Sequence, residues 1–316
     1  MKLLPVRHAS LLESCSEDDR WLVEGLWAEQ AVGLIGGEPK SFKSYAALDL
    51  AVAVASGTPC LRHYPVRRTG TVLLYAAEDA PTIVRERLEG ICKAAGLDLR
   101  DIPVQVITST RLRLDTDEDR KRLRHTVATL RPVLLVLDPF IRLHRADENQ
   151  SSEISPMLAY LRDLQRDFAI AVTVVHHAKK GASRERPGQA LRGSSEFHGW
   201  GDSNLYLQRK GDTLTLSIEH RAAPSSNGIP LRLEDHSGTG LALTVVDHDP
   251  EPAPKPTATP SARILDALNT LEAPVPLGEL RGLCRMRTQT LCDTLAGLVS
   301  EGRVVHEDQG YRLSRD

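Results

Sequence analysis

The feature that most constrains the fold of this chain is the stretch GGEPKSFKS, residues 36–44, between an apolar run and an Ala-rich segment. A strand, a Gly-rich turn and a helix in this order form a phosphate-binding loop, because backbone N–H groups and the helix N-terminus then point at one anion. Gly37, Lys43 and Ser44 fit the pattern Gly, four residues, Gly-Lys, then Ser or Thr. The alternative interpretation is an ordinary Gly-rich turn between a strand and a helix.

The loop is expected to bind ATP together with Mg²⁺. In such loops the lysine, here Lys43, reaches the β- and γ-phosphates, and the hydroxyl of the next residue, here Ser44, ligates the metal. The residues predicted to contact the nucleotide are Gly37, Glu38, Pro39, Lys40, Ser41, Phe42, Lys43, Ser44 and Tyr45.

Phe42 departs from the pattern, because it occupies the position of the second glycine. Glycine there permits backbone conformations and a close approach that a side chain hinders. A side chain directly before the lysine is compatible with a working loop if its φ is negative and its ring points away from the phosphates. We interpret the loop as functional on these two conditions.

Two acidic residues follow later apolar runs. Asp138 ends the run LLVLD, and ligands of open α/β sheets bind at the carboxyl ends of the strands. We expect Asp138 to hold Mg²⁺ through water. Glu78, in YAAED, is expected to orient and deprotonate the water that attacks the γ-phosphate. The next residue, Asp79, precedes Ala80 and Pro81 and is expected to cap a helix, which is also the alternative explanation for this acidic pair.

A pair of histidines, His176 and His177, ends the apolar run at 169–177. A single histidine at a strand end is more often a structural polar residue than a catalytic one. Two in succession at the edge where ligands bind allow one of them to contact the γ-phosphate and report hydrolysis. We assign this role to His176, with His177 as the alternative.

Apolar runs at 31–37, 71–79, 132–140 and 169–177 alternate with segments of helical spacing. Runs uninterrupted by polar residues are typical of strands that are buried on both faces of a mostly parallel sheet. The alternation therefore predicts an α/β fold. A β-hairpin is expected within residues 203–221.

The window DPEPAPKPTATP, residues 249–260, contains five prolines and is predicted to be a semi-rigid linker. It separates a lead segment, 1–30, and a nucleotide-binding domain, 31–248, from a C-terminal domain, 261–316. The last shows three helical patterns followed by two short strands, which predicts a small winged helix-turn-helix domain.

The length, net charge and cysteine content of the chain exclude few classes of protein. The chain has 316 residues and a net charge of -2, so global charge argues neither for nor against nucleic acid. Five scattered cysteines without a CxxC pair indicate reduced thiols, not a disulfide framework or a zinc ribbon. No run reaches the roughly 18 uncharged apolar residues of a membrane span, and the N-terminus is a poor signal peptide. We therefore expect a cytoplasmic protein without a membrane partner.

Positive charge is local. The segment AKKGASRERPGQALRG, residues 178–193, is expected to contact nucleic-acid phosphates, the alternative being a solvated basic loop. The basic segment after Asp138, 141–147, is a candidate companion loop. The C-terminal domain has seven basic and eight acidic residues, so contact with DNA and contact with protein both remain open. The predicted nucleic-acid contacts are Lys179, Lys180, Arg184, Arg186, Arg192, Arg285 and Arg287.

Six segments carry a family resemblance over residues 31–235: GGEPKSFKS, LLYAAED, LLVLDPF, VVHHAKK, ALRGSSEFHGWGDSNLYLQRK and IEHRAAPSSNGIPLRL. In this order they resemble the RecA-type ATPases of the hexameric helicase superfamily, and most closely the RepA-like replicative helicases of plasmids and phages. The resemblance implies a RecA-like P-loop core, Mg²⁺-ATP hydrolysis, single-stranded DNA as a partner and a ring, most simply a hexamer. Replication or recombination proteins are further partners that it suggests.

The resemblance also implies a catalytic arginine that acts on a neighbouring subunit. In DnaB-like relatives the segment matching EHRAAPSSNG carries a Lys-x-Arg pair that reaches the neighbour's nucleotide. Arg221 aligns with that arginine finger, whereas Glu219 occupies the lysine position. This charge reversal would weaken contact with the neighbour's phosphates.

Three functions remain open at this point. The first is a DNA-dependent ATPase or helicase that moves on single-stranded DNA. The second is an ATP-switched DNA-binding regulator or loader, accessory to replication, recombination or transposition, without unwinding activity. The third is a nucleotide-binding scaffold without turnover. Glu219 favours the second over the first.

Overall fold

The computed structural model describes residues 3–11, 16, 18–177, 196–235, 240–246, 260–269, 273–284, 286, 288–307 and 309–314. The chain divides into two compact units, Met1–Asp247 and His248–Asp316.

The described part of the first unit contains a nine-stranded sheet in the order β11-β10-β9-β8-β3-β7-β6-β4-β5. The bounds are β3 Val32–Gly37, β4 Val72–Ala76, β5 Val104–Val106, β6 Leu134–Asp138, β7 Ala171–His177, β8 Ser203–Lys210, β9 Thr213–His220, β10 Ser226–Asp235 and β11 Leu241–Val245. Neighbouring strands from β8 to β5 run parallel, and β9, β10 and β11 continue the sheet antiparallel. The predicted mostly parallel α/β sheet is confirmed.

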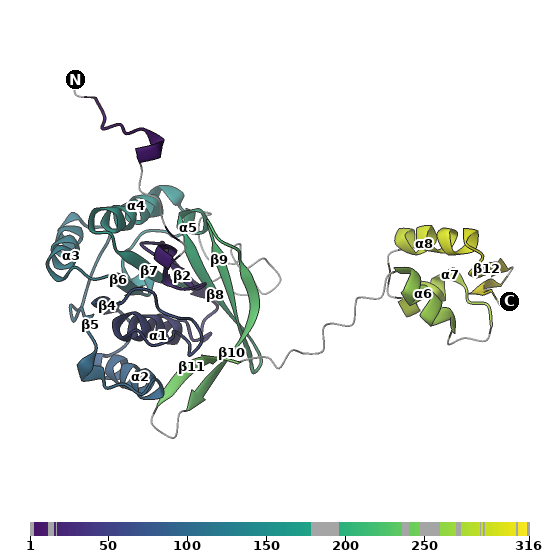
Figure 1. Cartoon of the computed structure of the whole chain (residues 1–316), viewed down its shortest axis with the longest axis horizontal. Coiled ribbons are helices and arrows are strands. Elements are labelled where there is room, and N and C mark those ends of the chain that lie inside the picture. The colour runs from purple at the N-terminus through teal and green to yellow at the C-terminus, as the bar shows by residue number, and fades with distance from the viewer. Residues whose placement is uncertain are drawn as a thin grey trace. The chain divides into compact units, whose positions relative to one another are not determined.

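Helices cover both faces of this sheet (Figure 1). Helices α1 (Lys43–Ser56) and α2 (Pro81–Ala94) pack on one face, and α3 (Asp117–Leu130), α4 (Ser151–Phe168) and α5 (Glu196–Trp200) pack on the other. Each face has its own hydrophobic core, so a side chain's position along a strand decides which core it enters. Short 3₁₀ turns occur at Ala9–Leu11, Asp18–Arg20, Leu99–Asp101 and Phe140–Arg142.

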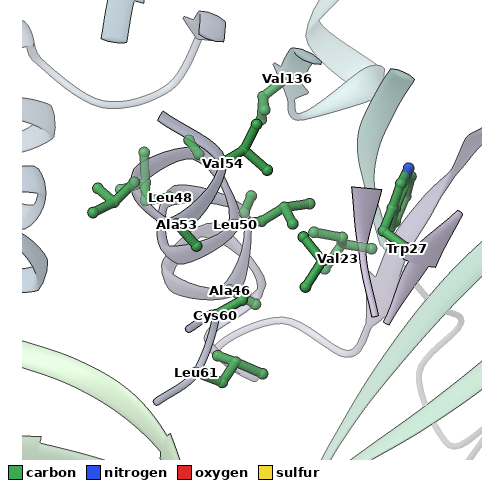
Figure 2. Close-up of a cluster of buried hydrophobic side chains, with 14 of the residues drawn as sticks. Val23, Trp27, Ala46, Leu48, Leu50, Ala53, Val54, Cys60, Leu61 and Val136 are labelled. Carbon is green, nitrogen blue, oxygen red and sulfur yellow. The ribbon is translucent and has the colours of Figure 1, made fainter. Parts of the chain in front are cut away.

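Helix α1 is buried on nearly all sides, which fixes the loop that precedes it. Figure 2 shows Leu48, Leu50, Ala53 and Val54 pointing from this helix in different directions into the core. A helix that is apolar around its whole circumference is stable only when it is surrounded by other elements. The N-terminus of α1, where the loop ends, is therefore held rigidly against the sheet.

Part of the N-terminal lead belongs to the same core. Strands β1 (Trp21–Val23) and β2 (Trp27–Ala28) form a small antiparallel sheet. Val23 and Trp27 are fully buried and belong to the cluster that surrounds α1 (Figure 2). The lead predicted for residues 1–30 thus contributes core residues from Leu22 onward.

The described residues of the second unit form three helices followed by an antiparallel hairpin, the element order that the sequence indicated. The bounds are α6 Pro260–Asn269, α7 Leu277–Cys284, α8 Thr288–Ser300, β12 Val304–Glu307 and β13 Gly310–Leu313. Its separate core includes Ile264, Leu280 and Leu291. Of the predicted linker, residues 249–259 lie outside the described residues, and Pro260 begins α6.

Within the described ranges, no helix is both long and apolar enough to cross a membrane. The described cysteines are unpaired: Cys60, Cys92 and Cys284 are buried and Cys292 is exposed. Burial raises the pKa of the Cys92 thiol to about 11, which keeps it protonated and unreactive at neutral pH.

Candidate nucleotide site

The loop between β3 and α1 closes tightly on its own backbone. Gly37 ends β3, and a Cβ atom there would lie 2.3 Å from the Leu207 carbonyl oxygen and 2.6 Å from Ser41 Oγ. Only glycine fits so close to a neighbouring strand. Both the backbone N–H and the hydroxyl of Ser41 donate to the Glu38 carbonyl oxygen, at 3.3 and 2.8 Å. The turn therefore has a defined shape between two rigid elements.

Phe42 does not meet one of the two conditions set from the sequence. It has φ 63° and ψ 26°, the left-handed conformation, at the N-cap of α1. The condition of a negative φ is not met: the backbone keeps the conformation that glycine adopts easily, at a strain of about 1–2 kcal/mol. The ring packs against the Tyr45 ring, with centroids 6.2 Å apart, and lies 5.2 Å from the Arg209 guanidinium carbon. These contacts with α1 and β8 offset the strain.

Lys43 is held at the centre of the loop. Lys43 is 5% exposed, and its Nζ donates a hydrogen bond to the Glu38 carbonyl oxygen at 2.7 Å. Burial lowers the pKa of Lys43 to about 8, against the opposing charges of Asp138, Glu78 and Glu38. A phosphate bound beside the amine would favour its charged form further. The buried position gives Lys43 the access to the loop interior that a phosphate-binding lysine requires.

Ser44 and Asp138, the two predicted metal ligands, are in contact. The Ser44 hydroxyl donates a hydrogen bond to the Asp138 carboxylate. Burial raises the pKa of Asp138 to about 6, and the carboxylates of Asp79 and Glu78 act in the same direction, while Ser44 and Lys43 oppose it. A buried carboxylate near two others is stabilised by a divalent cation. A hydroxyl and a carboxylate are the hard oxygen donors that Mg²⁺ prefers.

Within the described residues, no group of three or more His, Cys, Asp or Glu side chains could hold a metal ion. Mg²⁺ at Ser44 and Asp138 would complete its octahedron with substrate phosphates and water, which is its usual mode in nucleotide sites. The residues present therefore fit this ion.

Glu78 lies at the same edge of the sheet as Asp138. Ala76, at the end of β4, pairs with Asp138 in the parallel register, and the Ala77 N–H donates to the Asp138 carbonyl oxygen at 2.7 Å. The Glu78 carboxylate accepts a hydrogen bond from Arg142 Nε at 2.7 Å, and its side chain is 42% exposed. A half-exposed carboxylate beside the metal-binding edge can reach a water molecule.

Asp79 does not cap α2. The N-cap is Ala80, without a side-chain cap, and Pro81 occupies the first helical position. Asp79 instead accepts from Arg87 Nη1 at 2.5 Å, and the Arg87 guanidinium lies 5.3 Å from the centre of the Tyr45 ring. The cap prediction was wrong because an ion pair to Arg87, in the second turn of α2, takes this carboxylate. The contact connects α2 to the start of α1.

His176 is enclosed on the α4 side of the sheet. Its ring is fully buried next to Phe197, at 4.2 Å between centroids, and stacks on Phe140 at 6.2 Å. Nδ1 lies 2.8 Å from the His177 carbonyl oxygen and Nε2 lies 3.7 Å from Glu148 Oε1. Burial lowers the pKa of His176 to about 4, against the opposing charge of Glu148. His176 is therefore a neutral core residue in this structure.

The alternation of β7 separates the two histidines. Val174 belongs to the α4-side core and Val175 to the α1-side core. Because successive side chains of a strand point to opposite faces, His177 shares the face of Val175 and α1. His177 also pairs with Gly37 in the parallel register of β7 and β3. The geometry thus favours His177 over His176 for contact with the phosphates.

Residues 2–183 match the family model described as an AAA domain. The chain belongs to this family. The AAA-domain match includes the loop, Glu78, Asp138 and both histidines.

Two solved structures share the fold of this AAA-domain protein. One is a DnaB-like replicative helicase, described with its interactions with primase: TM-score 0.52, 16% identity, covering 68% of this chain and 57% of that chain. The other is the RadB recombinase: TM-score 0.50, 19% identity, covering 69% of this chain and 92% of that chain. The likeness confirms the predicted RecA-like P-loop fold. This chain spans little more than half the length of the DnaB-like helicase.

Arg221 lies at the end of the parallel strands opposite the loop of its own chain. Its backbone N–H donates to the Asp202 carbonyl oxygen, and the Asp202 N–H donates to the carbonyl oxygen of Val32, where β3 begins. The loop follows Gly37, where β3 ends, about 16 Å further on at roughly 3.3 Å per residue. Arg221 and the loop of one chain are therefore too far apart to bind the same phosphate.

Glu219, which the sequence resemblance aligns with a lysine, contacts a side chain of its own chain. Its Oε2 lies 3.1 Å from His198 Nε2. The carboxylate is therefore held by the chain itself.

All seven predicted nucleic-acid residues, Lys179, Lys180, Arg184, Arg186, Arg192, Arg285 and Arg287, lie outside the described residues. Three side chains were missed from the sequence: Arg142, which contacts Glu78, and Arg162 and Asp202, which lie beside Arg221. Arg142 contacts an acid 64 positions away and Arg162 one 40 positions away, so local spacing contains no signal for either contact. A charge count of the companion segment 141–147 was the only available indication of Arg142.

Proposed function

We propose that the protein is a Mg²⁺-dependent ATP hydrolase that is stimulated by single-stranded DNA and acts as an oligomeric, RepA-like translocase or helicase. The observation that carries the proposal is the convergence of Lys43, Ser44, Asp138 and Glu78 at one edge of the sheet. These four side chains come from three separate segments, and together they supply a phosphate ligand, two metal ligands and a base.

Hydrolysis would proceed by in-line attack of water on the γ-phosphate. Lys43 and the backbone N–H groups of the loop neutralise the phosphate oxygens. Ser44 and Asp138 hold Mg²⁺, which supplies further positive charge to the phosphates when it is bound. Glu78 orients the attacking water and accepts its proton. His177, at the end of β7, contacts the γ-phosphate and senses its loss.

Arg221 would complete the site of a neighbouring copy. It is 54% exposed and lies at the sheet edge remote from its own loop. An arginine that enters from a second subunit stabilises transition-state charge and couples hydrolysis to assembly. The resemblance to RecA-type helicases suggests a ring of six subunits.

DNA binding rests on the sequence and on the structural neighbours. The basic segment 178–193 directly follows β7, which ends beside the loop. A basic segment at this place would contact DNA phosphates without reading sequence and would respond to the nucleotide through His177. Both structural neighbours are named for work on DNA, as a replicative helicase and a recombinase.

We assign 31–248 as the ATPase domain, 1–30 as its lead, 249–260 as the linker and 261–316 as a winged helix that recruits DNA or a replication or recombination partner. The three helices and hairpin of the second unit support the last assignment. Arg285 and Arg287 precede α8 and would be the contacts of that domain with DNA.

The second candidate is an ATP-switched regulator or loader without unwinding activity. The contact between Glu219 and His198 favours it, because no lysine is present there to reach the neighbour's phosphates. In this case ATP would control assembly, and turnover would be slow.

Steady-state ATP hydrolysis tests the proposal when it is measured without DNA, with single-stranded DNA and with duplex DNA. We expect turnover that requires Lys43, disappears in Lys43→Ala and rises several-fold on single strands. Absence of Lys43-dependent turnover in all three conditions would contradict the proposal and favour a scaffold. Turnover without displacement of a DNA strand would identify the regulator.

A further inference from the structure

We propose that Asp202, braced by Arg162, is a positioning residue that presents the Arg221 guanidinium to the active site of a neighbouring copy. The proposal rests on the function proposed above, in which Arg221 acts between subunits. It adds a carboxylate, and a mechanical link to β3 and α4, that hold the arginine in place.

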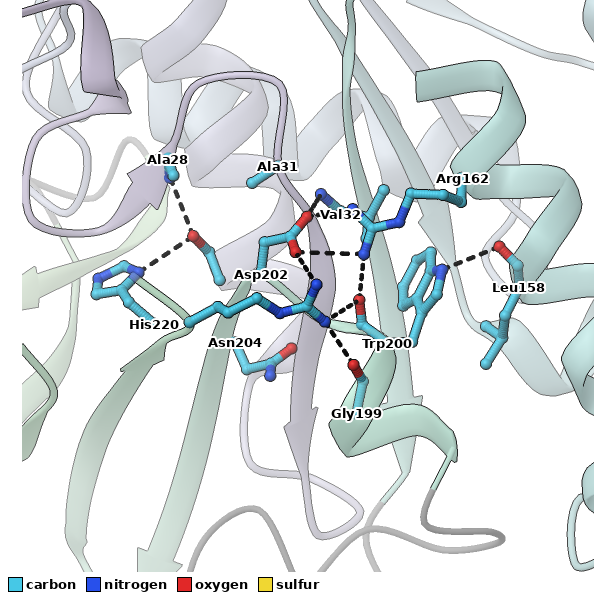
Figure 3. Close-up of polar contacts among 12 residues, drawn as sticks. Ala28, Ala31, Val32, Leu158, Arg162, Gly199, Trp200, Asp202, Asn204 and His220 are labelled. Carbon is cyan, nitrogen blue, oxygen red and sulfur yellow. Dashed lines mark hydrogen bonds and ion pairs between the residues drawn. The ribbon is translucent and has the colours of Figure 1, made fainter. Parts of the chain in front are cut away.

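Asp202 is fixed before it contacts Arg221. Its backbone N–H donates to the Val32 carbonyl oxygen at 2.7 Å, and its Oδ2 accepts from the Val32 N–H at 3.2 Å. The same carboxylate accepts hydrogen bonds from both terminal nitrogens of Arg162, a residue of α4, as Figure 3 shows. A carboxylate bound to a strand backbone and to a two-pronged guanidinium has little freedom to rotate.

Arg162 is itself held on its outer side. It donates to the Trp200 carbonyl oxygen, and its guanidinium carbon lies 5.9 Å from the centre of the Trp200 ring (Figure 3). The Trp200 indole N–H donates to the Leu158 carbonyl oxygen of α4 at 2.9 Å. Helix α4, the end of α5 and the start of β3 thus form one bonded platform around Asp202.

Arg221 is attached to the outer side of this platform. Its Nη1 lies 3.1 Å from Asp202 Oδ1, and its Nη2 donates to the Gly199 carbonyl oxygen at 2.5 Å. Its side chain is 54% exposed, whereas those of Arg162 and Asp202 are 18% and 22% exposed. Two guanidinium groups share one carboxylate, and the more exposed of the two, Arg221, presents its charge at the surface.

The arrangement matters because a long arginine side chain loses much conformational freedom when it is fixed in a transition state. Arg221 is fixed by its own chain before a second copy docks, so assembly does not have to order it. The opposite interpretation is that Asp202 competes with the neighbour's phosphates and holds Arg221 back. The two interpretations predict opposite effects on the rate: loss of the carboxylate slows hydrolysis in the first case and accelerates it in the second.

The test uses mixtures of two inactive variants. Lys43→Ala lacks the phosphate lysine but keeps Arg221, and Arg221→Ala lacks the finger but keeps the loop. In a mixture, the loop of an Arg221→Ala copy can meet the intact finger of a Lys43→Ala copy, so ATP hydrolysis should reappear. The same mixture is then made with Asp202→Asn added to the Lys43→Ala copy.

We expect the Asp202→Asn donor to reduce the recovered kcat about tenfold at unchanged KM for ATP. Asp167→Asn in the same donor is the matched control, since Asp167 also pairs with an arginine, Arg124, but on the exposed surface of α3 and α4. It should recover full activity. Recovery that is equal to or higher than that of the unmodified donor, with Asp202→Asn present, would overturn the proposal.

Failure of the proposed function gives a different result. If the first mixture, without Asp202→Asn, shows no hydrolysis although wild type hydrolyses ATP, Arg221 does not act between subunits. The role of Asp202 then falls with it, while the proposed ATPase activity stands. If Asp202→Asn does not fold, as judged by thermal melting, Asp202→Glu replaces it, because the charge is kept but displaced by one methylene. A folded Asp202→Glu donor with wild-type recovery would contradict precise positioning.

Discussion

Arg142 Nε donates to the Glu78 carboxylate at 2.7 Å, so the acid proposed to activate water is paired with the segment that follows Asp138, the proposed metal ligand. Both side chains are largely exposed, at 61% and 42%. Exposed ion pairs of this kind contribute at most about 1 kcal/mol. The contact therefore orients Glu78 but leaves it able to exchange Arg142 for water when a nucleotide is bound.

Replacing Glu78 by glutamine should abolish most hydrolysis and keep ATP binding. The amide retains the shape of the side chain but cannot accept the proton of water, and loss of a general base typically lowers kcat by about 10²–10⁴-fold. Single-turnover hydrolysis and equilibrium nucleotide binding measure the two properties. Glu86→Gln, an exposed residue on α2, is the control and should leave kcat within about twofold of wild type, as is usual for surface substitutions. A Glu78→Gln protein with wild-type kcat would exclude Glu78 as the base.

The left-handed backbone at Phe42 predicts an unusual order of stabilities. Alanine and glycine both lose the ring contacts with Tyr45 and Arg209, but only alanine retains the strain of φ 63°. Phe42→Gly should therefore be more stable than Phe42→Ala by about 1 kcal/mol. Urea unfolding of the two variants measures this difference. Alanine being as stable as glycine would contradict the left-handed conformation.

The buried ion pair of Asp49 and Arg62 should contribute far more to the free energy of unfolding than an exposed ion pair does. Asp49 is fully buried within α1 and contacts the Arg62 guanidinium and the Leu61 N–H. Removing one partner of a buried pair costs about 3–5 kcal/mol, although the 18% exposure of Arg62 places the expected loss for Arg62→Ala near the lower end, about 3 kcal/mol.

Arg67→Ala is the matched control for that change. Arg67 pairs with Glu24, and both side chains are more than 40% exposed. Loss of this pair should change the free energy of unfolding by no more than about 1 kcal/mol. Chemical denaturation distinguishes the two variants. Equal losses in Arg62→Ala and Arg67→Ala would show that Asp49 is solvated or otherwise compensated.

Acid should destabilise the protein partly through His176. Its pKa is about 4 in the folded state and 6.5 ordinarily, so the unfolded chain binds the proton first as the pH falls. The stability that depends on neutral His176 is present above pH 6.5 and is lost between pH 6.5 and about 4. At pH 5 the loss is about 2 kcal/mol.

His176→Gln removes this titration. Between pH 7.5 and pH 5, the wild type should lose about 2 kcal/mol more unfolding free energy than the variant, because all other titrating groups are common to both. Denaturant unfolding at the two pH values gives the difference. Parallel losses in both proteins would mean that His176 is not held neutral by burial.

The element order was predictable from the sequence wherever apolar runs were continuous. Helices α2, α3 and α4 and strands β3, β4, β6 and β7 were all indicated, because their apolar residues follow one period each. Strand β5 is only three residues long, and β10 is mostly exposed, so neither leaves an apolar run in the sequence. Both were missed for that reason.

The residue types of the site were predictable from the sequence, but the directions of its side chains and backbone were not. Strand alternation places His176 and His177 on opposite faces, but only the packing of α1 decides which face is that of the loop. The sign of φ at Phe42 depends on how the turn closes against β8. The contact of Asp202 with Arg162 joins residues 40 positions apart, and local sequence contains no record of it.

The measurement that tests the central claim most directly is ATP hydrolysis per subunit as a function of protein concentration, with the mass of the species recorded in parallel. If Arg221 completes the site of a second copy, monomers should hydrolyse ATP no faster than Lys43→Ala does. The rate per subunit should then rise with the fraction of assembled protein and level off. Monomers that hydrolyse ATP as fast per subunit as the assembled protein would show that each chain contains a complete site, and would contradict the account.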